Sequence, residues 1–294
     1  MTEWDWYRTF LAVLSEGSLS GAARALGIAQ PTVGRHIAAL ESALGLALFT
    51  RSQTGLLPTE AALSLQPHAK AMHSTAATLE RTAASYGDGV RGVVRVTVSE
   101  VIGVELMPAV LASLRAQYPA LSVELVLSNQ VQDLLQREAD IAVRMTPPKQ
   151  DQLVARRVGA IELGLHASPA YLARQPAPVT LEALAGHTLI GYDTATPAVR
   201  AALRRWPQLA RQHIALRTDS DVAQLAMIRA GAGIGVCQVA LARHPPGLVR
   251  VLPSEFALPM QTWVTMHEDL RDSPRCRVTF DALVEALTHH AGLT

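Results

Sequence analysis

Residues 17–45 read GSLSGAARALGIAQPTVGRHIAALESALG, and this stretch decides how the first part of the chain folds. Glycines at both ends and at Gly27 divide it into two short segments with helical spacing. Ser18 or Ser20 can cap the first segment, and a proline suits the first turn of the second. An amphipathic helix over residues 4–15 precedes them. The pattern predicts three helices, the last two joined by a tight glycine turn.

The third predicted helix, which begins near Gln30 and Pro31, has one apolar and one polar face. Its apolar stripe advances in steps of four, three and four residues: Val33, Ile37, Leu40 and Leu44. The opposite face carries Gln30, Thr32, Arg35 and His36. In a helix-turn-helix that binds DNA, the second helix enters the major groove, where Gln and Arg contact adenine and guanine edges. This face is therefore a candidate DNA-reading surface.

The residues after this helix predict a small hairpin. Phe49, Thr50 and Arg51 lead into a turn at Gly55, and an apolar pair with Pro58 follows. This arrangement is typical of the wing of a winged helix, from which Arg51 can reach a phosphate.

Charge leaves the question of DNA binding open. The chain has 26 Lys and Arg against 25 Asp and Glu, a net charge of +1 with His neutral. Residues 1–60 hold four arginines and five acidic residues, a net of −1. DNA-binding domains are usually basic, although a few phosphate contacts can come from a local patch. A three-helix cluster with a polar outer face also occurs in proteins that never bind DNA.

The order of residues in this region resembles a known family. The N-terminal domain of LysR-type transcriptional regulators is similar in register over about fifty positions: Phe10-Leu11-Ala12-Val13, Gly17-Ser18-Leu19-Ser20-Gly21-Ala22-Ala23, Leu26-Gly27-Ile28-Ala29-Gln30-Pro31-Thr32-Val33-Gly34-Arg35-His36-Ile37, Leu40-Glu41, Leu44-Gly45 and Leu48-Phe49-Thr50-Arg51. The resemblance implies a set of residues that contact DNA: Gln30, Pro31, Thr32, Arg35 and His36 on the recognition helix, and Arg51 on the wing.

Two positions depart from the family pattern. Ala29 stands where the family usually has a serine that caps the recognition helix, and Gln53 and Thr54 occupy a wing stretch that is often richer in arginine. We therefore expect weaker phosphate contacts and salt-sensitive non-specific binding.

Residues 59–86 predict one long helix with a seven-residue repeat. The repeat consists of Leu65, Ala69, Met72, Ala76, Leu79, Ala83 and Tyr86. This spacing favours packing of one helix on another, although a helix lying on its own domain also needs an apolar stripe. Pro67 could kink the helix or break it near its start. The resemblance implies a linker helix that pairs antiparallel in a dimer.

The remaining two thirds alternate between strand-like and helix-like segments. The expected strands are 93–98, 122–127, 140–143, 161–166, 187–192, 214–218, 234–238 and 261–267. The expected helices are 101–117, 131–137, 196–205, 221–230 and 274–289. Alternation of this kind predicts a parallel sheet, and its restart after residue 160 predicts two α/β lobes.

Ligands of open α/β sheets bind beyond the carboxyl ends of the strands. The polar residues at such positions are the candidate effector-binding set: Ser99, Ser128, Asn129, Arg144, Tyr192, Asp219 and Gln238. Each has a simpler interpretation, because a serine can merely cap a helix and an arginine can form a surface ion pair. Their equivalent positions in the topology favour a cleft.

Three further segments resemble the effector domain of the same family: residues 139–144, 167–172 and 230–235. That domain is similar to periplasmic binding proteins and holds a small inducer between its lobes. By this resemblance the chain crosses between lobes near 161–163 and returns near 265–267. Arg144 suggests an anionic ligand such as a carboxylate, by bidentate pairing.

Nothing in the sequence points to catalysis, a metal or a cofactor. No G-x-S-x-G or H-E-x-x-H motif is present, and the glycines at 231, 233 and 235 have the wrong spacing for a dinucleotide site. The two cysteines are far apart, and Cys237 suits a buried structural thiol. No run of 18 apolar residues or signal peptide is found, which predicts a cytoplasmic protein with no membrane contact.

We therefore predict an α+β multidomain protein. Its parts are a winged helix-turn-helix (1–58), a linker and dimerisation helix (59–88) and a two-lobed effector-binding domain (89–294). Lobe I is expected at about 89–162 and 267–294, and lobe II at about 163–266. The predicted function is a transcriptional regulator, a homodimer or homotetramer, that binds double-stranded promoter DNA and a small effector. The alternative is a cytoplasmic small-molecule-binding protein or an enzyme with an accessory helical domain.

Overall fold

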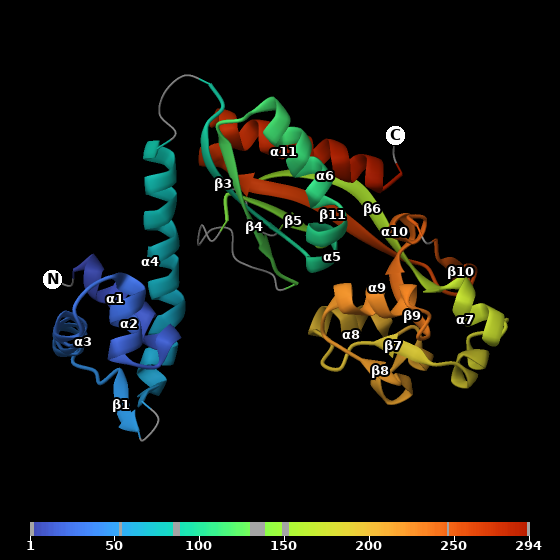
Figure 1. The fold of residues 1–294 in the computed structure, drawn as a ribbon, viewed down its shortest axis with the longest axis horizontal. Coiled ribbons are helices and arrows are strands. Elements are labelled where there is room, and N and C mark those ends of the chain that lie inside the picture. Colours follow the sequence, from blue (N-terminus) through green and yellow to red (C-terminus); the bar gives the residue numbers. More distant parts are fainter. Residues whose placement is uncertain are drawn as a thin grey trace. The chain divides into compact units, whose positions relative to one another are not determined.

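The computed structural model describes residues 3–52, 55–84, 89–129, 139–148, 153–245 and 247–292. These residues form two compact units, one that reaches Ala84 and one that holds the described residues from 89 onward (Figure 1). Each unit has its own buried core. Across the described residues, no helix is long and apolar enough to cross a membrane.

The first unit contains the predicted three helices, α1 (Trp4–Glu16), α2 (Leu19–Leu26) and α3 (Gln30–Leu44). The Ser18 hydroxyl caps α2 by accepting a hydrogen bond from the Gly21 N–H at 3.0 Å. Gly27 ends α2 with a φ of 67°, a left-handed conformation that suits glycine, and so turns the chain into α3. The core of the unit draws on all three helices: Phe10, Val13, Ala22, Ala23, Val33, Ile37 and Leu40.

The predicted wing is an antiparallel hairpin of β1 (Phe49–Ser52) and β2 (Gly55–Pro58). One carboxylate oxygen of Glu41 on α3 accepts hydrogen bonds from the N–H groups of Leu48 and Phe49, at 2.6 and 3.2 Å. Glu41 thereby ties the start of the hairpin to α3.

The long helix α4 (Glu60–Ala84) runs through Pro67 without interruption. Its first half packs on the same unit, because Ala62 and Ala69 are buried and Leu65 lies against the core of the three helices. Further along, Met72 and Leu79 are exposed. Packing on its own domain thus accounts for the first half of the repeat, pairing of the second half with another helix stays a prediction, and Tyr86 lies outside the described residues.

The second unit contains the two-lobed α/β domain. In lobe I lie β3 (Gly92–Val98), α5 (Glu100–Glu105), α6 (Met107–Gln117), β4 (Leu121–Leu127), β5 (Ile141–Arg144), β11 (Leu258–His267), a short 3-10 turn (Glu268–Leu270) and α11 (Pro274–His290). Strand β6 (Leu153–Ala167) serves both lobes. In lobe II lie α7 (Pro169–Arg174), β7 (Leu189–Gly191), α8 (Pro197–Leu203), β8 (Leu216–Arg217), α9 (Asp221–Arg229), β9 (Ile234–Gln238), α10 (Val239–Ala242) and β10 (Val249–Val251), with 3-10 turns at Glu182–Gly186, Pro207–Leu209 and Arg211–His213.

The sheet is mixed rather than parallel as predicted. Its strand order is β4-β3-β5-β11-β6-β9-β7-β8, with β10 beside β6. Parallel pairs occur within each lobe, β3 with β4 and β5, and β7 with β8 and β9. Between these two sets, β11 pairs antiparallel with β5 and β6, and β6 pairs antiparallel with β9. The long antiparallel strands that join the lobes break the parallel pattern.

Other expectations about this unit need correction. Strand β6 starts at Leu153, earlier than the expected 161, and the return between lobes comes near the start of β11, because Trp263–Met266 already pair with β5. The expected return at 265–267 is too late. The expected helix 101–117 is two helices that meet at Leu106, because the ring of Pro108 cannot continue α5. The expected helix 131–137 lies outside the described residues.

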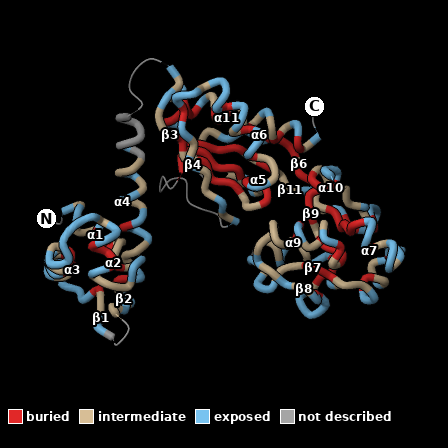
Figure 2. The backbone as a smooth tube through the Cα atoms, in the orientation of Figure 1, coloured by how far each residue is buried: buried red, intermediate tan, exposed pale blue. Residues whose placement is uncertain are grey.

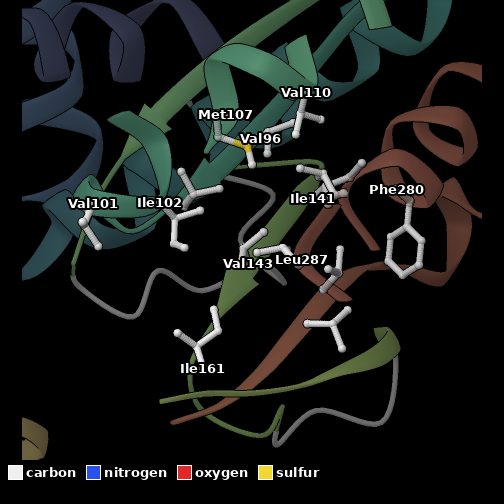
Figure 3. Packing of buried hydrophobic residues seen from close by; sticks show 14 of the residues in the cluster. Val96, Val101, Ile102, Met107, Val110, Ile141, Val143, Ile161, Phe280 and Leu287 are labelled. Atoms are coloured by element: carbon white, nitrogen blue, oxygen red, sulfur yellow. The ribbon is translucent and has the colours of Figure 1, made fainter. Parts of the chain in front are cut away.

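The core of lobe I lies between the sheet and its helices (Figures 2 and 3). Met107 and Val110 of α6, Val96 and Ile141 of the strands and Phe280 of α11 are among the side chains that fill it. These side chains pack α6 and α11 against the strands whose ends carry the candidate effector residues.

Candidate functional site

The polar face of α3 is open to solvent at its start. Gln30, Pro31 and Arg35 are exposed, while Thr32 and His36 are half-buried. Arg51 on the wing is exposed as well, opposite Leu56 in the hairpin. Of the six residues predicted to contact DNA, three are exposed on the helix, two are half-buried on the helix and one is exposed on the wing.

His36 has a partner inside the domain. Its Nδ1 lies 2.9 Å from the hydroxyl oxygen of Thr9 on α1, and that hydroxyl donates to the Asp5 carbonyl oxygen at 2.7 Å. Because the Thr9 proton is used on Asp5, the His36 Nδ1–H is the donor in the first contact. This arrangement orients the ring and leaves Nε2 as the atom available to an external partner.

A cavity of about 980 Å³ lies between the two lobes of the second unit. Lobe I contributes residues at the ends of β3, β4 and β5, and lobe II contributes residues of β7, α8, α9 and β9. Six of the seven candidate effector residues line this cavity: Ser99, Ser128, Asn129, Arg144, Tyr192 and Gln238. The topology therefore brings together side chains that are far apart in the sequence.

Asp219, the seventh candidate, does not line the cavity. Its carboxylate instead accepts a hydrogen bond from the Thr194 N–H at 2.7 Å and so holds the loop after β7. Asp221, the first residue of α9, lines the cavity in its place, and its carboxylate accepts a hydrogen bond from Asn129 at 3.3 Å. Burial raises the pKa of the Asp221 carboxyl; the bond from Asn129 opposes this rise, and nearby Glu100 adds to it.

Arg144 ends β5 with a guanidinium that the protein satisfies only in part. Its terminal nitrogens donate to the Thr97 carbonyl and hydroxyl oxygens, at 3.3 and 3.1 Å, and to the Val143 carbonyl at 2.9 Å. Its Nε is buried without an acceptor, and no carboxylate of the described residues pairs with it. Burial lowers the pKa of the group, which nevertheless stays charged. A half-buried cation without a counterion is a natural place for an anion.

Two further polar groups face the cavity without a protein partner in the described part of the chain. The Ser99 hydroxyl makes no capping bond to α5. The Gln238 carbonyl oxygen is bonded to Nε2 of His290 at 2.7 Å, which leaves the Gln238 amide nitrogen as a donor. With Arg144, these groups provide three sources of hydrogen-bond donors around one cavity.

Helices α5 and α9 connect the lobes next to the cavity. Arg229 donates to both carboxylate oxygens of Glu105, at 2.6 and 2.7 Å, and the Ser220 hydroxyl donates to Glu100 at 2.8 Å. The Arg229–Glu105 pair is bidentate and partly buried, so its geometry is well defined. We call these contacts the inter-lobe clasp.

Two more cavity residues stay protonated at neutral pH. Burial, with the nearby charges of Asp221, Glu100 and Asp219, raises the pKa of Tyr192 to about 12. Burial also raises the pKa of the Cys237 thiol to about 12, so it is not a thiolate. Within the described residues, no group of His, Cys, Asp and Glu is arranged to hold a metal ion.

Sequence reasoning missed most of the cavity wall. Thr146, Leu203, Trp206, Gln224 and Met260 all line it. Gln224 lies one helical turn after Asp221, so the helix pattern contained a signal for it. Trp206 follows α8 in irregular structure, and no periodicity marks such a residue.

Comparison with known proteins decides the family. The profile of the LysR substrate binding domain matches residues 87–288, and that of the bacterial regulatory helix-turn-helix protein of the lysR family matches residues 4–63. The chain belongs to the LysR family of transcriptional regulators. It therefore combines a helix-turn-helix domain of transcriptional regulators with the substrate binding domain of the same family, and the alternative of an enzyme with an accessory helical domain is wrong.

Individual relatives agree with this assignment. An HTH-type transcriptional regulator of Xanthomonas campestris is 32% identical over 178 residues, which cover 60% of this chain and 52% of that protein. The match thus spans about half the length of that relative. The structure of CrgA, a LysR-type regulator of Neisseria meningitidis, covers 98% of this chain and 99% of its own at 26% identity, with a TM-score of 0.59. Full-length CbnR, solved with its target DNA, is 20% identical with a TM-score of 0.65, covers 98% of this chain and 100% of its own, and shows the shared fold.

Proposed function

We propose that this LysR-family regulator reads its operator with the exposed start of α3 and is controlled by an anionic effector bound between its lobes. The observation that carries the proposal is the pairing, in one chain, of an exposed polar helix face with a cavity that contains the acceptor-free Arg144. The proposal includes a cytoplasmic location, because a regulator of this kind acts where the DNA is.

In this proposal Gln30 and Arg35 read base edges, with Thr32 and His36 beside them and Pro31 shaping the start of the helix. Gln and Arg have the donor and acceptor geometry for adenine and guanine. Arg51 on the wing contacts a phosphate, which positions the domain without adding sequence information. The exposure of Gln30, Arg35 and Arg51 supports these roles.

The DNA-reading assignment is tested by fluorescence anisotropy on DNA from upstream of the chain's own gene and on unrelated DNA. Arg35→Ala should weaken specific binding by about 1–3 kcal/mol and leave non-specific binding nearly unchanged. Arg51→Ala is the matched control, since loss of a phosphate contact should weaken both and reduce the salt slope by about one. If Arg35→Ala leaves the ratio of the two affinities unchanged, Arg35 does not read bases.

We further propose that the chain works as a homodimer or homotetramer, paired through α4. Leu65, Met72 and Leu79 are seven residues apart, and the last two are exposed. Exposed apolar residues at this spacing support helix-on-helix association. Light scattering of Leu79→Lys should show a lower mass than the wild-type chain, and Lys70→Ala, on the exposed helix surface, should not. An unchanged mass in Leu79→Lys would contradict pairing through this face.

The effector of this proposal is a carboxylate that pairs with Arg144 and accepts further bonds from Ser99 and Gln238. Charge complementarity supports it, because an anion would supply the acceptor that the buried Nε lacks. Binding would change the balance between arrangements of the lobes that make or break the inter-lobe clasp, and so the geometry presented to DNA. Thermal-shift measurements with small carboxylates test this, with Arg144→Met expected to remove the stabilisation. Stabilisation that survives this substitution would refute the role of Arg144.

A further inference from the structure

The cavity is larger and more apolar than a carboxylate site requires. At about 980 Å³ it reaches the upper end of the roughly 300–1,000 Å³ usual for drug-sized ligands. Beyond Arg144 it continues into lobe II, where its wall is made of side chains that also belong to the hydrophobic core of that lobe: Leu203, Trp206, Leu209, Ile214, Val236 and Leu258. We call this part the apolar compartment.

Two polar side-chain groups of the cavity wall, the Trp206 indole N–H and the Gln224 amide nitrogen, are already used by the protein. The Trp206 indole N–H donates to the Glu255 carbonyl at 2.9 Å, so the ring offers the cavity only carbon surface. The amide nitrogen of Gln224 donates to the Thr218 carbonyl at 3.1 Å. A polar group placed in this compartment would lose its water without gaining these bonds.

The other arginines of the cavity lie at its exposed rim. Arg211 is paired with Asp193 at 2.7 Å, and Arg200 donates to the Ala195 carbonyl oxygen. Arg204 is exposed to solvent. Because solvent screens these exposed groups more than the half-buried Arg144, Arg144 is the stronger anion partner.

We propose that the effector is a monocarboxylate with a long apolar tail, its head at Arg144 and its tail in the apolar compartment. This inference rests on the proposed anionic effector and adds the chemistry of the remainder of the ligand. Burial of the tail supplies affinity in proportion to its length, whereas the head supplies orientation.

The test is calorimetric titration of the full chain with butanoate, hexanoate, octanoate and decanoate, and with decanedioate. Affinity should rise by about fourfold for each methylene group, and decanedioate should bind more weakly than decanoate. Ala202→Phe places a ring in the cavity and should remove the dependence on chain length while keeping butanoate binding. Ala201→Phe, on the exposed neighbouring position, is the matched control and should keep the full dependence.

Each contrary result has a separate meaning. Equal affinity for butanoate and decanoate, or tighter binding of decanedioate, would contradict the proposal that an apolar tail binds in the compartment. The proposed anion site at Arg144 would be unaffected. Equal loss of chain-length dependence in Ala201→Phe and Ala202→Phe would also overturn it, because the effect would not come from the cavity. Failure of every carboxylate to bind the wild-type chain would overturn the proposed anionic effector and this inference together.

Discussion

The residues that we assign to base reading come from one stretch, Gln30 to His36, whereas the cleft draws Arg144 and Gln238 from the ends of two strands and Ser99 from the position after a third. The helix face is presented to water, where charged side chains cost the fold little. The cleft holds its cation Arg144 half-buried and without a counterion, where a charge costs the fold more than it does on the surface. The helix face should therefore contribute little to the free energy of unfolding. The cleft should lower that free energy, because it keeps Arg144 without a counterion.

The largest expected difference between the two sites is the effect of replacing the arginine of each site on binding and on the free energy of unfolding. Arg144→Met should weaken carboxylate binding by about 100-fold and raise the free energy of unfolding of the ligand-free chain by on the order of 1 kcal/mol, because a half-buried charge without a counterion is removed. Arg35→Ala should change that free energy by less than about 0.5 kcal/mol. Denaturant unfolding of both variants checks this, and a destabilised Arg144→Met would break the comparison.

Acid should affect the cleft-bearing unit through His166. Burial lowers the pKa of this histidine to about 4 from its ordinary 6.5, so the native protein keeps it neutral. Below pH 6.5 the unfolded chain takes up a proton on His166, whereas the native chain does not. The stabilisation associated with the neutral His166 is therefore complete above pH 6.5. It is lost as the pH falls through about 4, and amounts to roughly 3 kcal/mol.

Unfolding measured between pH 7 and pH 4 tests the assignment to His166. His166→Phe should have a shallower acid slope than the wild-type chain. His68→Gln, at an exposed position of α4 in the other unit, should keep the wild-type slope. Identical slopes in all three proteins would show that another group causes the acid sensitivity.

The inter-lobe clasp gives a smaller effect. Arg229→Met breaks a partly buried bidentate pair and should cost about 2 kcal/mol of unfolding free energy. Arg95→Met breaks the exposed pair with Glu124 and should cost less than about 1 kcal/mol. Equal costs would mean that the clasp is no stronger than a surface pair.

The smallest expected effect concerns the start of α3. Ala29 provides no side-chain hydrogen bond to the first turn, and Ala29→Ser should add one and stabilise the fold by about 1 kcal/mol. Thermal unfolding checks it. Because Gln30 and Arg35 lie in or next to that first turn, an ordered cap should also strengthen DNA binding slightly, and a weakened affinity would show that the serine interferes with the DNA.

The same contrast explains what the sequence could predict. The helix-turn-helix could be predicted from the sequence because its capping serine, turn glycine and apolar stripe all act within a few residues, as Ser18 and Gly27 show. In the cleft, the ends of strands indicated six residues that line the cavity, but Asp219 and Asp221 are both plausible after a strand, and only the fold decides which one faces the cavity. The antiparallel pairing of β6 with β11 depends on contacts about a hundred residues apart, which periodicity does not encode.

A hydroxyl-radical footprint of the purified chain on DNA from upstream of its own gene tests the central claim most directly. The account predicts protection of two half-sites on one face of the duplex, separated by one or more turns of about 10–10.5 base pairs, and loss of that protection in Arg35→Ala. No protection of any upstream fragment, even in dilute buffer, or protection that is undiminished by the substitution, would contradict it.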